Sequence, residues 1–318
     1  MTRSLLAGLL LALLSATAAA QAYPARPLRL IVPFPPGGSN DIVARMVATQ
    51  LGERLAKPVV VENHGGAGGI IGTEIAAKSA PDGYTLLLIS VAFAFNSSIY
   101  KLSYDPASAF TPVAMLGSGP VVLAVSASLP VSSVKELLAL AREKPGELHY
   151  ASAGVGSFQH LAAALFKLQS GVDIVHVPFR GGGPALMDVV AGNTQIAIGA
   201  LVQMLPQIRT GRLKALGIGS AKRVAALPEV PTIAEAGVPG YEATNWWGVV
   251  APAGVPAGAL ERLHRELEAV LGTMETRHRF ETEGAEATRM SADDFGKLIA
   301  SETQKWARVV KDAGIKAE

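Results

Sequence analysis

The chain has 318 residues, of which 49% are hydrophobic and 17% charged, with a formal net charge of +2 and no cysteine. A chain this apolar can bury real cores, so its composition excludes an intrinsically disordered protein, and its length suits about two domains. The near-zero net charge argues against nucleic acid as a partner, and the absence of cysteine excludes disulfides, thiol nucleophiles and cysteine metal sites.

The first 22 residues have the layout of a secretory signal peptide. A basic start at Arg3 precedes an apolar run over 5–14, and small residues follow from Ala18 to Ala22. The run is too short to span a membrane, and it lacks the amphipathic pattern of an ordinary buried helix. We therefore expect an exported protein that is cleaved after Ala22 or after Ala20.

Short apolar runs and amphipathic stretches alternate over the next part of the chain. Strands are expected at 28–32, 58–62, 85–90, 121–126, 149–152, 174–178, 195–198 and 213–218. Helices are expected at 41–55, 70–78 and 134–143, the last capped by Ser132 or Ser133, and in the gaps between the other strands. This alternation predicts parallel sheets flanked by helices.

The last third of the chain has a different pattern. Prolines punctuate a connection at 227–232, and a strand-like run follows at 241–250. Two amphipathic stretches, 259–271 and 292–311, predict helices that complete the fold.

Four of the predicted strand-to-helix turns are rich in glycine, namely 35–41, 65–69, 153–157 and 180–184. The first turn of a helix carries free N–H groups and a partial positive charge, so it attracts anions. Glycine lets a ligand approach the backbone closely, and ligands of open α/β sheets gather where such turns lie. One glycine-rich turn is usually only a turn, but four predict a neutral anion site lined by backbone groups.

No motif for catalysis or nucleotide binding is present. The chain contains neither G-x-x-x-x-G-K-[ST] nor G-x-S-x-G, and the stretch from Gly66 to Gly72 is one residue too long for G-x-G-x-x-G. The six histidines lack the spacing of metal ligands. These patterns give no support to a P-loop enzyme, an α/β-hydrolase or a metalloenzyme.

Three side chains near the predicted site have more than one interpretation. His160 either reaches the cleft or packs locally. One of Trp246 and Trp247 is expected to line the cleft and the other to join the core, because adjacent residues of a strand face opposite ways. Asp41 suits the start of a helix, where a carboxylate meets the positive end of the helix dipole.

The order of motifs along the chain resembles the Bug family, the periplasmic receptors of tripartite tricarboxylate transporters. The likeness rests on 30–38 followed by Asp41, on 81–86, on 227–232 and on 251–254, and it covers essentially the whole mature chain. One departure is that this chain has Asn-His-Gly-Gly at 63–66, where the family often has Asn-Arg-Pro-Gly.

The resemblance implies an α/β protein with the type II periplasmic-binding-protein fold. Each of two lobes would hold a mainly parallel sheet flanked by helices, with two crossings near Ala124 and Leu227. Lobe 1 would comprise 23–124 plus 228–318, and lobe 2 would comprise 125–227. The implied function is a monomeric periplasmic receptor that captures a small organic carboxylate between its lobes for the membrane subunits of the transporter. No catalysis, cofactor or metal is implied. A periplasmic sensor for signalling is the alternative, followed by an exported α/β hydrolase.

The ligand is expected to meet neutral backbone donors rather than an arginine, because the turns after 28–32 and 149–152 contain no Lys or Arg. A bulky β-branched residue at Gly38 or Gly156 should then weaken binding more than Arg180→Ala. Phe34 is expected to shut water out at the mouth of the cleft. The candidate ligand-binding residues are Phe34, Pro36, Gly37, Gly38, Ser39, Asp41, Ser90, Gly154, Gly156, Ser157, Gln159, His160, Phe179, Gly181 and Trp246.

Overall fold

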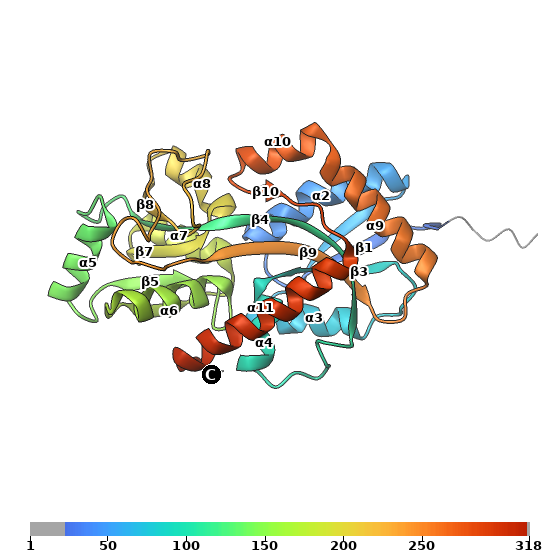
Figure 1. Cartoon of the computed structure of the whole chain (residues 1–318), viewed down its shortest axis with the longest axis horizontal. Coiled ribbons are helices and arrows are strands. Elements are labelled where there is room, and N and C mark those ends of the chain that lie inside the picture. Colours follow the sequence, from blue (N-terminus) through green and yellow to red (C-terminus); the bar gives the residue numbers. More distant parts are fainter. Residues whose placement is uncertain (1–22, 317–318) are drawn as a thin grey trace, which may run out of the picture.

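The computed structural model describes residues 23–316. The expected signal peptide and both of its expected cleavage sites lie outside these residues. Two sheets, linked by the long strand β4 (Phe110–Ser126), form an elongated α/β molecule (Figure 1). Within 23–316, none of the helices combines the length and the apolar character that a membrane span requires.

The first sheet has the strand order β2-β1-β3-β9-β4, with β10 added to β4. Its strands besides β4 are β1 (Leu28–Val32), β2 (Val59–Asn63), β3 (Thr85–Ser90), β9 (Thr244–Pro252) and β10 (Glu286–Ala287). β1 is parallel to β2 and β3, whereas β9 and β4 join in antiparallel pairs. The helices around this sheet are α2 (Ser39–Leu55), the 3-10 turn η1 (Ala67–Gly69), α3 (Ile70–Ala77), α4 (Val91–Ile99), α9 (Ala257–Gly272), α10 (Met274–Thr282) and α11 (Ala292–Asp312).

The second sheet is built on the other end of β4. Its further strands are β5 (His149–Ser152), β6 (Val175–Pro178), β7 (Ile196–Ala200) and β8 (Leu213–Ile218). β5 is parallel to β6 and β7, and β4 pairs antiparallel with β7 and β8. The surrounding helices are α5 (Val134–Glu143), α6 (Phe158–Ser170), α7 (Gly182–Ala191) and α8 (Leu201–Arg209).

The chain passes between the sheets at two neighbouring places. β4 pairs with β9 as far as Pro120, and its pairing with β7 starts at Val121. The chain returns from the second sheet to the first at Ala243, whose backbone forms hydrogen bonds with Gly219 and Val121. β9 begins at the next residue, Thr244. Leu227, where a crossing was expected, instead packs in the core of the second sheet. Figure 1 shows β4 and β9 running together along the middle of the molecule.

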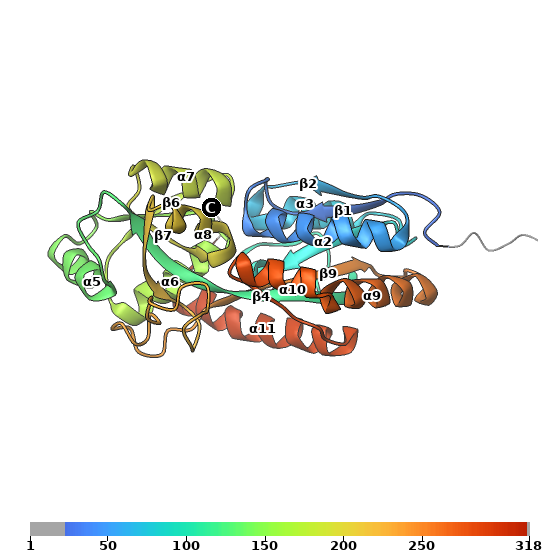
Figure 2. The ribbon, with the colours of Figure 1, turned by 90° about the horizontal axis from the view of Figure 1, so that it is seen from above.

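Helix α11 binds the two halves of the molecule together on one side. Its Trp306 is fully buried and packs against Phe95 of α4 and Phe158 of α6, with ring centroids 5.9 and 6.1 Å apart. Figures 1 and 2 show α11 running beneath β4 and β9 from one half toward the other. One apolar core therefore extends across both halves.

Most of the strands and helices predicted from the pattern are present, and the cap of α5 by Ser133 is confirmed. The first half of β4 was not predicted, because Pro112, Gly117 and Gly119 are typical turn residues. β4 accommodates them with register shifts against β9. The strands β4, β8 and β9 join in antiparallel pairs, so each sheet contains both parallel and antiparallel strands. Strand–helix alternation alone predicted only parallel sheets.

Candidate ligand-binding cavity

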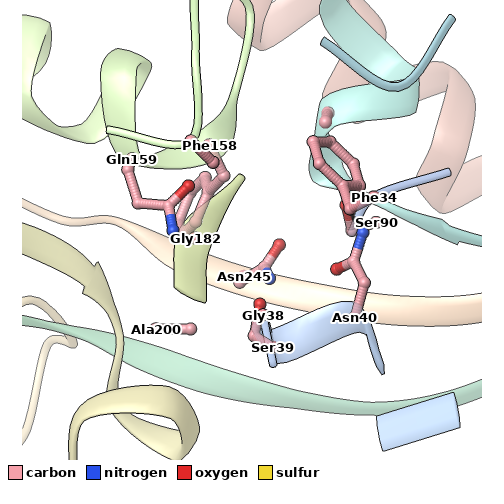
Figure 3. Close-up of a pocket in the computed structure, with 12 residues that line it drawn as sticks. Phe34, Gly38, Ser39, Asn40, Ser90, Phe158, Gln159, Gly182, Ala200 and Asn245 are labelled. Carbon is pink, nitrogen blue, oxygen red and sulfur yellow. Dashed lines mark hydrogen bonds between the residues drawn. The ribbon is translucent and has the colours of Figure 1, made fainter. Parts of the chain in front are cut away.

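A narrow cavity lies between the two sheets (Figure 3). The space that a water-sized sphere can occupy in it is about 20 Å³, which is room for roughly one water molecule. Both halves of the chain contribute to its wall. The lining residues are Phe34, Gly38, Ser39, Asn40, Ser90, Ala92, Ala153, Phe158, Gln159, Gly182, Ala200 and Asn245.

Five helices of the described chain begin at this cavity. Gly38 to Asn40 start α2, Ser90 precedes α4, Phe158 and Gln159 start α6, and Gly182 and Ala200 mark the starts of α7 and α8. The prediction that the four glycine-rich turns lead into helices is confirmed, since the caps are Gly38, Gly69, Ser157 and Gly181. The positive ends of α2 and α4 thus face those of α6, α7 and α8.

Four of the five helices that begin at the cavity lack a side-chain cap, as do α3 and α9 elsewhere in residues 23–316. The caps Gly38, Ser90, Gly181 and Ala200 make no side-chain hydrogen bond to their helices. By contrast α5, α10 and α11, which begin away from the cavity, are capped by the hydroxyls of Ser133, Thr273 and Ser291. The first-turn N–H groups around the cavity are therefore left for a ligand.

Helix α6 does have a side-chain cap, but its first N–H groups are still left for a ligand. Its cap Ser157 is fully buried, and the hydroxyl accepts a hydrogen bond from His160 N at 3.3 Å. The N–H groups of Phe158 and Gln159 precede this bonded position, and both residues line the cavity. Ser157 therefore shapes the turn without lining the cavity.

Charged side chains do not contribute to the described cavity lining. Asp41 is buried, but its carboxylate accepts bonds from Gly37 N, Arg45 Nε and Asn63 Nδ2, each at 3.0 Å. Burial opposes ionisation, yet the bonds from Arg45, Gly37 and Asn63 hold the pKa of Asp41 below its usual range. Contrary to the expectation of a ligand contact, Asp41 fastens the turn that precedes α2.

The polar side chains of the wall are held by one another. Asn40 donates from Nδ2 to Ser90 Oγ at 3.3 Å and accepts from Trp247 Nε1 at 3.0 Å. Across the cavity, Gln159 donates to Gln203, which in turn donates to the carbonyl of Gly182. These bonds fix which atoms the amides present to the cavity.

An outer groove adjoins the cavity at its mouth. Pro36, Gly154, Phe179 and Gly181 line this groove, and Phe34 lines both the groove and the cavity. The groove is wide, with about 720 Å³ open to water-sized molecules. Phe34 therefore lies where the cavity and the groove meet.

Two expected residues lie away from both spaces. Trp246 packs on Phe295 of α11 at 5.8 Å, and its Nε1 donates to Glu302 at 3.4 Å. The cavity side of β9 instead carries Trp247, which holds Asn40. The sequence left open which tryptophan lines the cleft and named Trp246 as the candidate contact, whereas Trp246 lies on the α11 side of β9.

The two halves touch at the rim of the cavity. Tyr100 Oη donates to the carbonyl of Val155 at 2.9 Å. Gly156 leaves no room beside this ring, because a Cβ there would come within 2.7 Å of Tyr100. A Cβ on Gly68 would lie 3.0 Å from the carbonyl oxygens of Val155 and Gly156. The structure is therefore in a closed arrangement.

The Asn-His-Gly-Gly departure gives the turn after β2 its close packing. A Cβ on Gly65 would come within 2.5 Å of Pro35 Cδ, and Gly66 has a φ of 133°, which favours glycine. His64 Nε2 lies 3.4 Å from Glu62 and takes no part in the cavity. The turn supports the Pro35 loop from outside.

His160 belongs to a stack of rings beside the site. Its ring is stacked on His176 at 4.1 Å, and His176 is stacked on Tyr150 at 5.0 Å. Ser152 Oγ contacts His176 Nε2 at 2.6 Å. Of the two interpretations of His160, local packing is the one the structure supports.

This stack makes the stability of the protein sensitive to acid. Burial, with a smaller contribution from Lys167, lowers the pKa of His160 to about 4; burial, with the neighbouring His160 and Lys167, lowers that of His176 to about 3. The unfolded chain therefore takes up protons first, so stability present above about pH 6.5 is lost as the pH falls toward 4. We expect the two histidines together to lower the free energy of unfolding by about 2 kcal/mol when the pH falls from 7 to 5, allowing for solvent screening.

Denaturant unfolding at the two pH values measures this loss. His160→Gln should reduce the pH dependence, while His278→Gln, which changes an exposed histidine of α10, should leave it unchanged. Equal pH dependence in the wild type and His160→Gln would contradict the assignment.

Several cavity residues were not predicted. Asn40 and Gly182 lie inside two of the glycine-rich turns but were not chosen as ligand contacts, and Phe158 directly follows a third turn, so all three could have been included from the sequence. Asn245 had no such signal, because the neighbouring tryptophans dominate the pattern there. Its place on the cavity wall depends on the course of β9 between the sheets.

The fold and the cavity together define a solute-binding protein of the periplasmic-binding-protein class. The periplasmic binding protein BugD has a TM-score of 0.89 and 32% identity to this chain, covering 93% of this chain and 100% of BugD. A structure of an R. palustris protein with adipate has a TM-score of 0.90 and 37% identity, covering 92% of this chain and 99% of that one. The two-lobe fold class expected from the sequence is thus confirmed.

Residues 43–315 match the family described as tripartite tricarboxylate transporter family receptor. The chain is also 40% identical to the protein BugT of Bordetella pertussis over 310 residues, covering 95% of this chain and 94% of BugT. The chain therefore belongs to the tripartite tricarboxylate transporter receptor family, and its resemblance to the Bug proteins is confirmed.

Proposed function

We propose that the protein is a periplasmic receptor that captures a small organic carboxylate in the cavity and delivers it to the membrane subunits of a tripartite tricarboxylate transporter. The observation that carries this proposal is an uncharged cavity at which five described helices begin with unused N–H groups. Such groups, in a site shielded from water, bind a carboxylate strongly without a cationic side chain.

The composition of the wall favours a receptor over an enzyme. Two hydroxyls line the cavity, those of Ser39 and Ser90. The hydrogen-bond partner of Ser90 is the amide of Asn40, which cannot serve as a base, and the described lining includes no His, Asp, Glu or Lys that could activate either hydroxyl. None of the described lining residues titrates near neutral pH. The adipate in the R. palustris structure, a dicarboxylate, agrees with this class of ligand.

Calorimetric titration with adipate and shorter dicarboxylates tests the proposal. We expect the affinity to stay within about threefold from pH 6 to pH 8.5, because neither the wall nor the ionised ligand titrates in that range. Affinity should fall below about pH 5, where the ligand carboxylates take up protons. A tenfold change between pH 6 and pH 8.5 would show that an ionisable protein group holds the ligand.

Uptake measurements test the transport role separately from binding. Cells that lack this protein should lose uptake of the carboxylate that it binds, and the protein supplied in trans should restore it. A protein that only signals would bind the same carboxylate while the rate of uptake in pre-induced cells stays unchanged.

A further inference from the structure

One polar side chain of the cavity has no hydrogen-bond partner. Asn245 is the second residue of β9 and is 1% exposed, and its side chain points into the cavity (Figure 3). Its Oδ1 is shielded from solvent and unpaired within the described chain. The other amides of the wall, Asn40 and Gln159, each have a protein partner. A buried amide oxygen left unpaired is costly, which makes Asn245 a candidate ligand contact.

Asn245 lies on the floor of the cavity rather than at a helix start. It pairs with Gly119 on β4, one residue before the place where β4 turns to the second sheet. Trp247, two residues along the same face of β9, holds Asn40 in the wall. A ligand whose carboxylate meets the N–H groups at the helix starts therefore presents another part of itself to Asn245.

The chemistry of an amide restricts what that part can be. A carboxylate oxygen only accepts hydrogen bonds, so it pairs with Asn Nδ2 and leaves Oδ1 unpaired. Exchanging the positions of Oδ1 and Nδ2 in Asn245 does not remove the need for a donor, because the amide oxygen stays buried in either orientation. A hydroxyl both donates and accepts, so it can pair with Oδ1. An ammonium group would also donate, but its charge would be buried in a wall whose described residues include no acid.

We infer that Asn245 is a specificity-determining residue that selects small carboxylates carrying a hydroxyl group over the same carboxylates without one. This inference rests on the proposed function, because it assumes that a carboxylate occupies the cavity. The inference adds the class of substrate, which is a hydroxycarboxylate. Its hydroxyl would donate to Asn245 Oδ1, and its carboxylate would lie at the helix starts.

Calorimetry with matched ligands tests the inference. Two pairs differ only by one hydroxyl, malate against succinate and 2-hydroxyglutarate against glutarate. The wild type should bind the hydroxylated member at least about tenfold more tightly in the pair whose length fits the cavity. Asn245→Leu removes both polar atoms at similar size and should bring the ratio to within about threefold. Asn245→Ala provides the same test if leucine blocks the cavity, and thermal unfolding checks that both variants fold.

The outcomes separate this inference from the proposed function. If the wild type binds both members of each pair equally, the hydroxyl inference is overturned while carboxylate binding stands. A preference that persists in both Asn245 variants would also overturn it, because another group would then recognise the hydroxyl. If no carboxylate binds the wild type at all, the proposed function fails and this inference fails with it.

Discussion

Gly38→Val is expected to weaken carboxylate binding by at least about 100-fold while leaving the fold intact. Gly38 caps α2 with φ −83° and ψ 167°, an extended conformation that valine adopts readily. The nearest atom to an added Cβ is the carbonyl oxygen of Pro35, at 3.8 Å, so the new side chain meets open space. There it would cover the N–H groups of Ser39 and Asn40. Two charge-assisted hydrogen bonds, each worth about 1.5–3 kcal/mol, would be lost.

Two control variants make this result specific. Gly258→Val places the same side chain on α9, where an added Cβ meets nothing within 4 Å, and should bind normally. Arg180→Ala removes the cation nearest to the turn before α7, at the outer groove, and should change the affinity less than about threefold. Calorimetry ranks the three variants, and thermal unfolding checks their folding. A larger loss in Arg180→Ala than in Gly38→Val would mean that a cation, rather than the helix starts, holds the ligand.

The helix starts around the cavity were predictable from the sequence because each of them is a local feature. Each glycine-rich turn leads into a helix within a few residues, so Gly38 and Ser157 could be recognised as helix starts without knowing the tertiary fold. The residues that the sequence could not place depend on long-range packing. Trp246 and Trp247 differ only in which face of β9 meets α11, and Asn245 reaches the cavity only because β9 runs on from one sheet toward the other.

The sheet itself was predicted less completely for the same reason. Alternation predicts the parallel strands β1, β2 and β3 and the parallel pair β5 and β6, because a helix follows each strand before the next one begins. β4 is instead defined by partners far away in the chain, with β9 on its first half and β7 and β8 on its second. Its Pro112 and Gly117 are tolerated because the register shifts beside them.

We expect the ligand to drive closure of the two lobes about a hinge in β4 and β9. The cavity of this closed structure has room for roughly one water molecule, so the halves must separate to admit a dicarboxylate and must stay slightly further apart around it than they are here. We propose that the hinge lies at Pro120–Val121 and Ala243–Thr244, where the backbone passes between the sheets. The helix starts on the two sides face an unfilled polar cavity in the empty protein, which favours the open form. Small-angle scattering should therefore show a smaller radius of gyration with saturating ligand than without.

Gly68→Ala tests closure without changing the cavity wall. A Cβ at Gly68 would lie only 3.0 Å from the carbonyl oxygens of Val155 and Gly156 on the other lobe, so the methyl group resists closure. Gly68→Ala should bind the carboxylate about tenfold more weakly than the wild type, and its radius of gyration should fall less when the ligand is added. Gly171→Ala is the matched control, because its φ of 67° is close to the 61° of Gly68 and nothing lies within 4 Å of its Cβ. Both variants bear the same backbone strain of about 1–2 kcal/mol, but only Gly68→Ala meets the opposite lobe. Equal affinity and equal compaction in the two variants would contradict hinge closure and favour a pocket that is open to ligand without lobe movement.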